Sequence, residues 1–128
     1  MSSQAAFKGV YPIGDTDPSA LPVKAIGPAA EFYQKVLGFS VVTSDPTRAV
    51  LGRDQVRIGL IRKEDHDPGQ AGSCYFDVSD VDAVRLELER NGGNPGPCGV
   101  QVHEGKHYRA FFLREDEDGY CFCIGQPA

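Results

Sequence analysis

The two halves of this chain repeat one another. Moving the first half by 55 positions aligns Val23 with Val78, Ile26 with Val81 and Gly38 with Gly93. Each half reads as a strand, a helix and three further strands, and each is too small to bury its own sheet face. The sequence therefore predicts an α+β fold, with two paired βαβββ modules that share one core.

The helices give the clearest periodic signal. In the first half, one apolar helix face is formed by Ala29, Phe32, Tyr33, Val36 and Leu37. Pro28 suits the first turn of this helix and Gly38 its C-terminal end. In the second half, Ser79 and Asp80 can cap a helix whose inner face carries Val81, Val84 and Leu88.

The chain has 128 residues, which is the length of one domain. We expect an extended lead-in over residues 1–18 with a short strand at Val10–Ile13, and a first module over residues 19–62. A loop rich in charge, Pro and Gly at residues 63–72 links it to a second module over residues 73–126. Expected strands are 21–25, 39–44, 48–51 and 55–61, then 74–78, 100–103, 107–113 and 120–124.

Charge and hydropathy exclude several classes of partner. With 13 basic and 18 acidic residues the net charge is -5, and no basic run exceeds Arg62-Lys63, so we expect no nucleic-acid binding. No apolar stretch is long enough to span a membrane, and the first residues lack the pattern of a secretory signal. We therefore expect a soluble, cytoplasmic protein with no membrane partner, whose four cysteines stay reduced.

The segment Glu31–Phe39, with the sequence EFYQKVLGF, resembles the FY…LGF helix of the vicinal oxygen chelate superfamily. This superfamily holds glyoxalase I, extradiol dioxygenases and the bleomycin-resistance proteins. Residues 49–58, 78–83 and 109–114 also resemble it, most of all its bleomycin-resistance branch, and the likeness extends over about residues 19–126. The resemblance implies a mixed sheet curled into a cup, a small organic ligand inside it, and a homodimer.

Metal-using members of that superfamily place His, Gln or Glu at four inward positions. By resemblance these positions fall near Pro18, Gly59, Ser73 and Cys123, none of which is a typical ligand of a hard divalent cation. We therefore expect neither a metal site nor another cofactor.

A second motif, H-E-x-x-H at His103–His107, matches the zinc-binding helix of metalloproteases. Its flanks are rich in β-forming residues, so we expect a three-residue hairpin turn at Glu104–Lys106 instead of a helix. Two turn histidines are usually solvated, although such a hairpin leaves open opportunistic metal binding by His103 and His107.

If the resemblance sets the inward face, the cup is lined by Arg57, Ser73, Tyr75, Cys121 and Cys123, with Tyr108 and Phe111 as further candidates for its wall. Aromatic rings, hydrogen-bonding groups and one cation suit an organic ligand with a planar part and an anionic group. The two cysteines are either ordinary packing residues or a thiol pair for a soft metal or an electrophile.

Three functions remain open. The first is a metal-independent binding protein that sequesters an organic, antibiotic-like ligand, as the empty ligand positions suggest. The alternative is an enzyme, either a glyoxalase-like lyase or isomerase or a dioxygenase, which would need metal ligands in the cup. A third is a lyase or isomerase without metal that uses Cys123, Tyr75 or Asp77 as acid or base.

Overall fold

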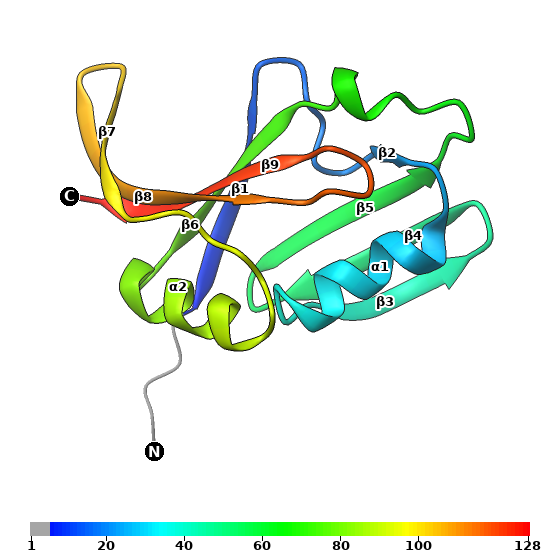
Figure 1. The fold of residues 1–128 in the computed structure, drawn as a ribbon, viewed down its shortest axis with the longest axis horizontal. Helices are drawn as coiled ribbons and strands as arrows, with labels where there is room; N and C mark the ends of the chain where they lie inside the picture. Colours follow the sequence, from blue (N-terminus) through cyan, green and yellow to red (C-terminus); the bar gives the residue numbers. More distant parts are fainter. Residues whose placement is uncertain (1–5) are drawn as a thin grey trace.

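The computed structural model describes residues 6–128, so the first five residues of the expected lead-in lie outside the described part. Two sheets and two helices make up the fold (Figure 1). The larger sheet contains, in spatial order, β1 (Phe7–Ile13), β6 (Ser73–Val78), β9 (Cys121–Pro127), β8 (Lys106–Arg114) and β7 (Gly99–His103). The smaller sheet contains β2 (Leu21–Val23), β5 (Val56–Arg62), β4 (Arg48–Arg53) and β3 (Ser40–Asp45). The helices are α1 (Ile26–Lys35) and α2 (Val81–Arg90), and a short 3₁₀ helix, η1 (Pro68–Gln70), lies in the linker.

The predicted duplication is visible in the strand order. The first module reads β2-β5-β4-β3 across its sheet, and the second reads β6-β9-β8-β7. In both modules the first strand runs parallel to the last, whereas the remaining pairs are antiparallel. The expected α+β fold of two βαβββ modules is therefore confirmed, and the sheets remain open.

Strand β1 differs from the expected lead-in. It begins at Phe7 rather than Val10, and it pairs with β6 of the second module, with Tyr11 opposite Tyr75 and Ile13 opposite Ser73. The expected short strand at Val10–Ile13 lies within β1, but its start and its partner were not predicted, because Gly9 and Pro12 interrupt the pattern and β6 lies far away in the sequence. The larger sheet thus gains a fifth strand from the start of the chain.

Both helices pack on the same side of the sheets as the hydrophobic core. In β6, Cys74, Phe76 and Val78 are buried, while the alternating residues Ser73, Tyr75 and Asp77 are partly exposed. The two modules meet in this core, where the ring of Phe7 lies 5.5 Å from that of Phe39 and 5.6 Å from that of Phe76, measured between centroids. We call the opposite side of the sheets, which carries Ser73, Tyr75 and Asp77, the open face.

The helix ends follow the predicted signals. Gly38 has a φ of +73°, a conformation that favours glycine, and the N–H of Phe39 donates to the carbonyl of Tyr33 at 2.9 Å to close helix α1. Asp80 caps α2, since its Oδ1 accepts a hydrogen bond from the N–H of Ala83 at 3.1 Å. Within the described residues, neither helix has the length and apolar character required to cross a membrane.

Candidate functional site

Three tyrosines form a continuous row on the open face of the larger sheet. The ring of Tyr75 on β6 lies 6.4 Å from that of Tyr11 on β1 and 5.7 Å from that of Tyr108 on β8, between centroids. Strand β9 separates β6 from β8, and Gly125 lies on β9 between the partners of Tyr75 and Tyr108. Because glycine has no side chain, the Tyr108 ring can reach across β9. We call Tyr11, Tyr75 and Tyr108 the aromatic row.

Phe112, rather than Phe111, extends this surface. Phe111 is completely buried in the core, whereas Phe112 is 43% exposed and lies opposite Cys123 on the open face. The expectation for Phe111 is therefore corrected. Adjacent residues of a strand point to opposite faces, and two consecutive phenylalanines give no pattern that says which one points inward.

The two cysteines of β9 share the open face with the aromatic row. Cys121 is opposite Ser73 and Cys123 is opposite Tyr75. Cys123 is only 8% exposed, and burial together with the nearby Cys121 raises the pKa of its thiol to about 11. The Ser73 hydroxyl donates to the carbonyl of Cys121 at 2.5 Å. At neutral pH Cys123 is thus a protonated, polarisable side chain and a weak nucleophile.

The hydroxyl group of Tyr75, the middle residue of the aromatic row, is held by a polar contact. Its hydroxyl donates to Oδ1 of Asp77 at 3.2 Å, and Nζ of Lys8 lies 3.9 Å from Oδ2 of Asp77. Burial raises the pKa of Tyr75 well above its ordinary value, and the charge of Asp77 raises it further. Tyr75 is therefore a neutral phenol that presents its ring to the open face.

Arg57 belongs to the smaller sheet. Its guanidinium lies on the backbone of Gly52, where the missing side chain leaves room for it. Its one described hydrogen bond is a long one, from Nη1 to the carbonyl of Val56 at 3.4 Å. The structure therefore brings Ser73, Tyr75, Tyr108, Cys121 and Cys123 together on one sheet, with Arg57 on the other.

The family's metal positions do not fit a hard divalent cation. The N–H of Gly59 donates to the carbonyl of Pro18 at 2.9 Å, so these two positions are adjacent in the structure. A Cβ at Gly59 would collide with the carbonyl oxygen of Ser19, so no ligating side chain fits there without a backbone shift. Ser73 and Cys123 supply no carboxylate or imidazole, and the described residues contain no cluster of three or more His, Cys, Asp or Glu suited to a metal.

The H-E-x-x-H segment is a hairpin and not a helix. Residues Glu104 and Gly105 have φ values of +50° and +79° and form a two-residue turn, one residue shorter than expected. His103 pairs with Lys106 and His107 pairs with Val102, so the two imidazoles lie on opposite faces of the hairpin. This arrangement provides no helical pair of zinc ligands.

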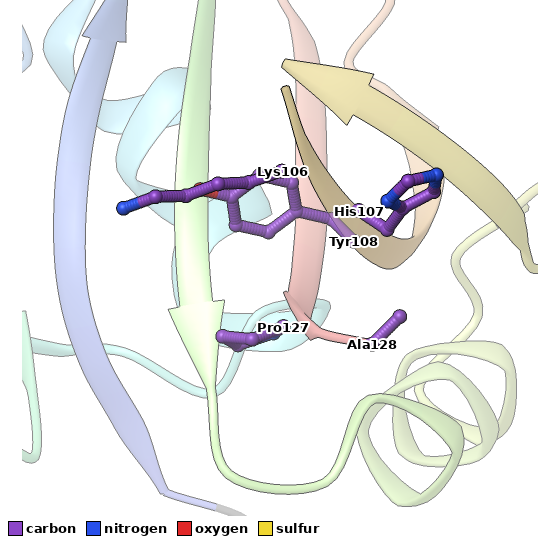
Figure 2. Close-up of a pocket in the computed structure, with 5 residues that line it drawn as sticks. All are labelled: Lys106, His107, Tyr108, Pro127 and Ala128. Atoms are coloured by element: carbon purple, nitrogen blue, oxygen red, sulfur yellow. The ribbon is translucent and has the colours of Figure 1, made fainter. Parts of the chain in front are cut away.

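A cavity of about 400 Å³ lies next to the aromatic row and was not predicted. It is lined by Lys106, His107, Tyr108, Pro127 and Ala128. Figure 2 shows the Lys106 side chain running alongside the ring of Tyr108, while His107 points away from both. The sequence assigned Lys106 to a turn, whereas the shorter turn makes it the first residue of β8 and places it on the same face as Tyr108.

Sequence reasoning also missed a buried polar cluster beneath the linker. Nε2 of His66 lies 2.8 Å from the carbonyl oxygen of Asp118, and its ring stacks on Tyr120 at 5.8 Å. Oδ1 of Asp118 accepts from the N–H of Lys24, and burial raises the pKa of Glu115. The cluster fastens the linker and the β8–β9 turn to the first module. A second cavity of about 570 Å³ beside it has an acidic rim that includes Asp15 and Asp65.

Comparison with known proteins identifies the family. The model of the Glyoxalase/Bleomycin resistance protein/Dioxygenase superfamily matches residues 16–124, and the chain belongs to this superfamily. The structure is similar to that of a bleomycin resistance determinant encoded on the transposon Tn5, with a TM-score of 0.74, 21% identity, and coverage of 88% of this chain and 98% of that one. A comparison with curated proteins found no match.

Two further solved structures share the fold. A bleomycin-binding protein from the bleomycin-producing Streptomyces verticillus, complexed with copper(II)-bleomycin, aligns with a TM-score of 0.67 and 21% identity, covering 86% of this chain and 93% of that one. TnmS3, an antibiotic binding protein from Streptomyces sp. CB03234, aligns with a TM-score of 0.64 and 17% identity, covering 91% of this chain and 99% of that one. At identities this low, the structural similarity establishes a shared fold and nothing more.

Proposed function

We propose that this protein binds a small organic molecule on its open face, in the manner of an antibiotic-binding protein, and holds it without a metal cofactor. The observation that carries this proposal is the uncovered aromatic row, in which Tyr11 is 56% exposed, continued by the exposed Phe112. A cluster of exposed aromatic side chains on one face is typical of a surface that binds a ligand or a partner. The similar bleomycin-binding and antibiotic-binding structures support the same class of ligand.

Binding would rest on stacking and apolar contact. A planar ring system laid on Tyr11 and Tyr75 gains the favourable offset or edge contacts of aromatic pairs. Beyond Tyr75, the partly buried thiol of Cys123 and the ring of Phe112 offer a polarisable apolar floor. None of these contacts requires a bond in the ligand to break.

We propose further that a second copy of the chain completes the cup. The open face of the single chain is not enclosed, and Tyr11, Ile13 and Phe112 leave large apolar surface exposed on it. A two-fold pair would cover part of this surface and bury more of the ligand. Light scattering coupled to gel filtration should give twice the monomer mass, and a monomer at micromolar concentration would contradict this assembly.

The binding proposal is tested by calorimetric titration with bleomycin, in metal-free and copper-loaded form, before and after treatment with a strong chelator. We expect binding that survives chelation of the protein. Tyr11→Ala should weaken it about two- to twelvefold, because one aromatic contact is worth about 0.5–1.5 kcal/mol. Val102→Ala is the matched control, since Val102 is exposed on the side away from the open face.

Two results would contradict the proposal. One is binding that disappears with the metal and returns with it. The other is a loss of affinity in Val102→Ala as large as that in Tyr11→Ala, which would place the ligand elsewhere. Mass spectrometry of the recovered ligand checks that it is chemically unchanged.

A further inference from the structure

Lys106 stands at one end of the aromatic row. Lys106 and Tyr108 alternate along β8 and therefore share the open face, and both line the cavity of about 400 Å³ (Figure 2). The ring of Tyr108 in turn contacts that of Tyr75 at 5.7 Å. The two rings are inclined by 67°, so a planar ligand that stacks on one of them meets the other at its edge, beside the side chain of Lys106.

The charge of Lys106 is not compensated within the described residues. It takes part in none of their ion pairs, and the one carboxylate at the cavity, the α-carboxylate of Ala128, forms no ion pair with Lys106. The nearest acidic residue in the hairpin, Glu104, lies 2.9 Å from Nε2 of His103, and Asp77 lies beside Lys8. An ammonium group beside aromatic surface that forms no ion pair is available to a negatively charged group of a ligand.

We propose that the ligand of this protein is an aromatic acid, a planar ring system that carries a carboxylate, sulfonate or phosphate group. The ring contacts Tyr75 and Tyr108, one by stacking and the other edge-on, and the acidic group accepts hydrogen bonds from the ammonium group of Lys106. This inference rests on the proposed binding function and adds the chemical class of the ligand. The net charge of -5 alone would favour a cationic ligand, so the proposed preference for an acid depends on the local charge of Lys106.

The experiment uses three probes that share one ring system and differ in charge: 2-naphthoate, 2-naphthylmethanol and 2-naphthylmethylammonium. Their affinities for the 128-residue protein are measured by calorimetry or by NMR titration at low ionic strength. We expect 2-naphthoate to bind at least about threefold more tightly than the neutral alcohol, and the cation to bind most weakly. This preference should shrink when salt is added, because exposed charges are screened.

Two matched variants locate the charge that is responsible. Lys106→Gln keeps a long polar side chain without the charge and should abolish the preference, so that naphthoate and the alcohol bind this variant with similar affinity. Arg57→Gln removes another exposed cation, on the smaller sheet, and should keep the preference intact. Tyr108→Ala should weaken all three probes together, because it removes ring contact rather than charge.

Each contrary result has a distinct meaning. If none of the probes binds the wild-type protein but bleomycin does, the inference of an aromatic acid fails and the proposed binding function stands; if bleomycin does not bind either, both fail. If all three bind equally, or the cation binds best, the face binds aromatic ligands but the inference of an acid is wrong. If Arg57→Gln abolishes the preference and Lys106→Gln does not, the acidic group is held on the smaller sheet and the assignment to Lys106 is wrong.

Discussion

At Gly59, the packing of the chain excludes a side chain and therefore also excludes a metal ligand. The carbonyl oxygen of Ser19 lies where the Cβ of any other residue at position 59 would be. The family resemblance places a metal ligand at this position in metal-using members. The close approach of Pro18 and Ser19 to β5 therefore accounts for the glycine and for the missing ligand together.

Gly59→Ala should lower the free energy of unfolding by about 1–3 kcal/mol, the usual cost of forcing extra atoms into a packed site. Chemical denaturation followed by circular dichroism measures the change. Gly27→Ala is the matched control, since nothing lies within 4 Å of an added Cβ there. Equal stability of the two variants would show that the Ser19 segment moves aside freely.

The buried thiol of Cys123 predicts a pH dependence. Its pKa is about 11 in the folded protein and 9.0 is its ordinary value, so the folded state holds the proton more tightly than the unfolded state. The stabilising contribution is complete below pH 9 and is lost as pH rises toward 11. In the folded protein, alkylation of Cys123 by iodoacetamide should be slow at pH 8 and should accelerate up to about pH 11. Rapid alkylation at pH 8, equal to that of the urea-unfolded chain, would contradict the burial of this thiol.

At the scale of elements, the sequence predicted what is local. Periodicity and end signals located both helices, and alternation located eight of the strands to within a few residues. The pairing of β1 with β6 and the burial of His66 depend on partners distant in the sequence, so no local sequence pattern predicts them. The sheet face on which Phe111 and Lys106 lie depends on the register of β8. A one-residue difference in the preceding turn moves every side chain of the strand to the opposite face. The candidate site was therefore predicted in Tyr75, Tyr108 and its two cysteines, but not in Tyr11, Phe112 or Lys106.

The cap of α2 gives a test at this scale. Asp80→Ala removes the side-chain acceptor for the N–H of Ala83 and should reduce the free energy of unfolding by about 1 kcal/mol. Asp65→Ala is the control, because Asp65 is exposed in the linker and accepts no described hydrogen bond. An unchanged unfolding midpoint for Asp80→Ala would show that water replaces the cap at no cost.

Across the whole molecule, Arg53 links the two modules. Its guanidinium donates to the carbonyl of Leu37 at 2.8 Å and to both carboxylate oxygens of Glu87 at 2.7 and 2.9 Å. The same group lies 4.6 Å from the ring centroid of Phe7. One residue of β4 thereby contacts the end of α1, the middle of α2 and strand β1, next to the phenylalanines that both modules share.

Because the core is shared, the protein should unfold in one cooperative transition, with the same midpoint by circular dichroism and by tyrosine fluorescence. Arg53→Lys loses the two-pronged contact with Glu87 and should lower the midpoint without splitting the transition. Arg62→Lys, at an exposed pair with a 3.6 Å separation, should have almost no effect. Two separate transitions in Arg53→Lys would show that the modules fold independently.

Strand β1 also bears on the order of events during synthesis. It is made before its pairing partner Ser73–Val78, which leaves the ribosome about 60 residues later. At about 5–20 residues per second, the nascent chain waits several seconds with Phe7 and Tyr11 unpaired. The whole first module is translated before the strand that β1 requires. During those seconds β1 has no strand to pair with, so the larger sheet can take up this edge strand only after β6 has been translated.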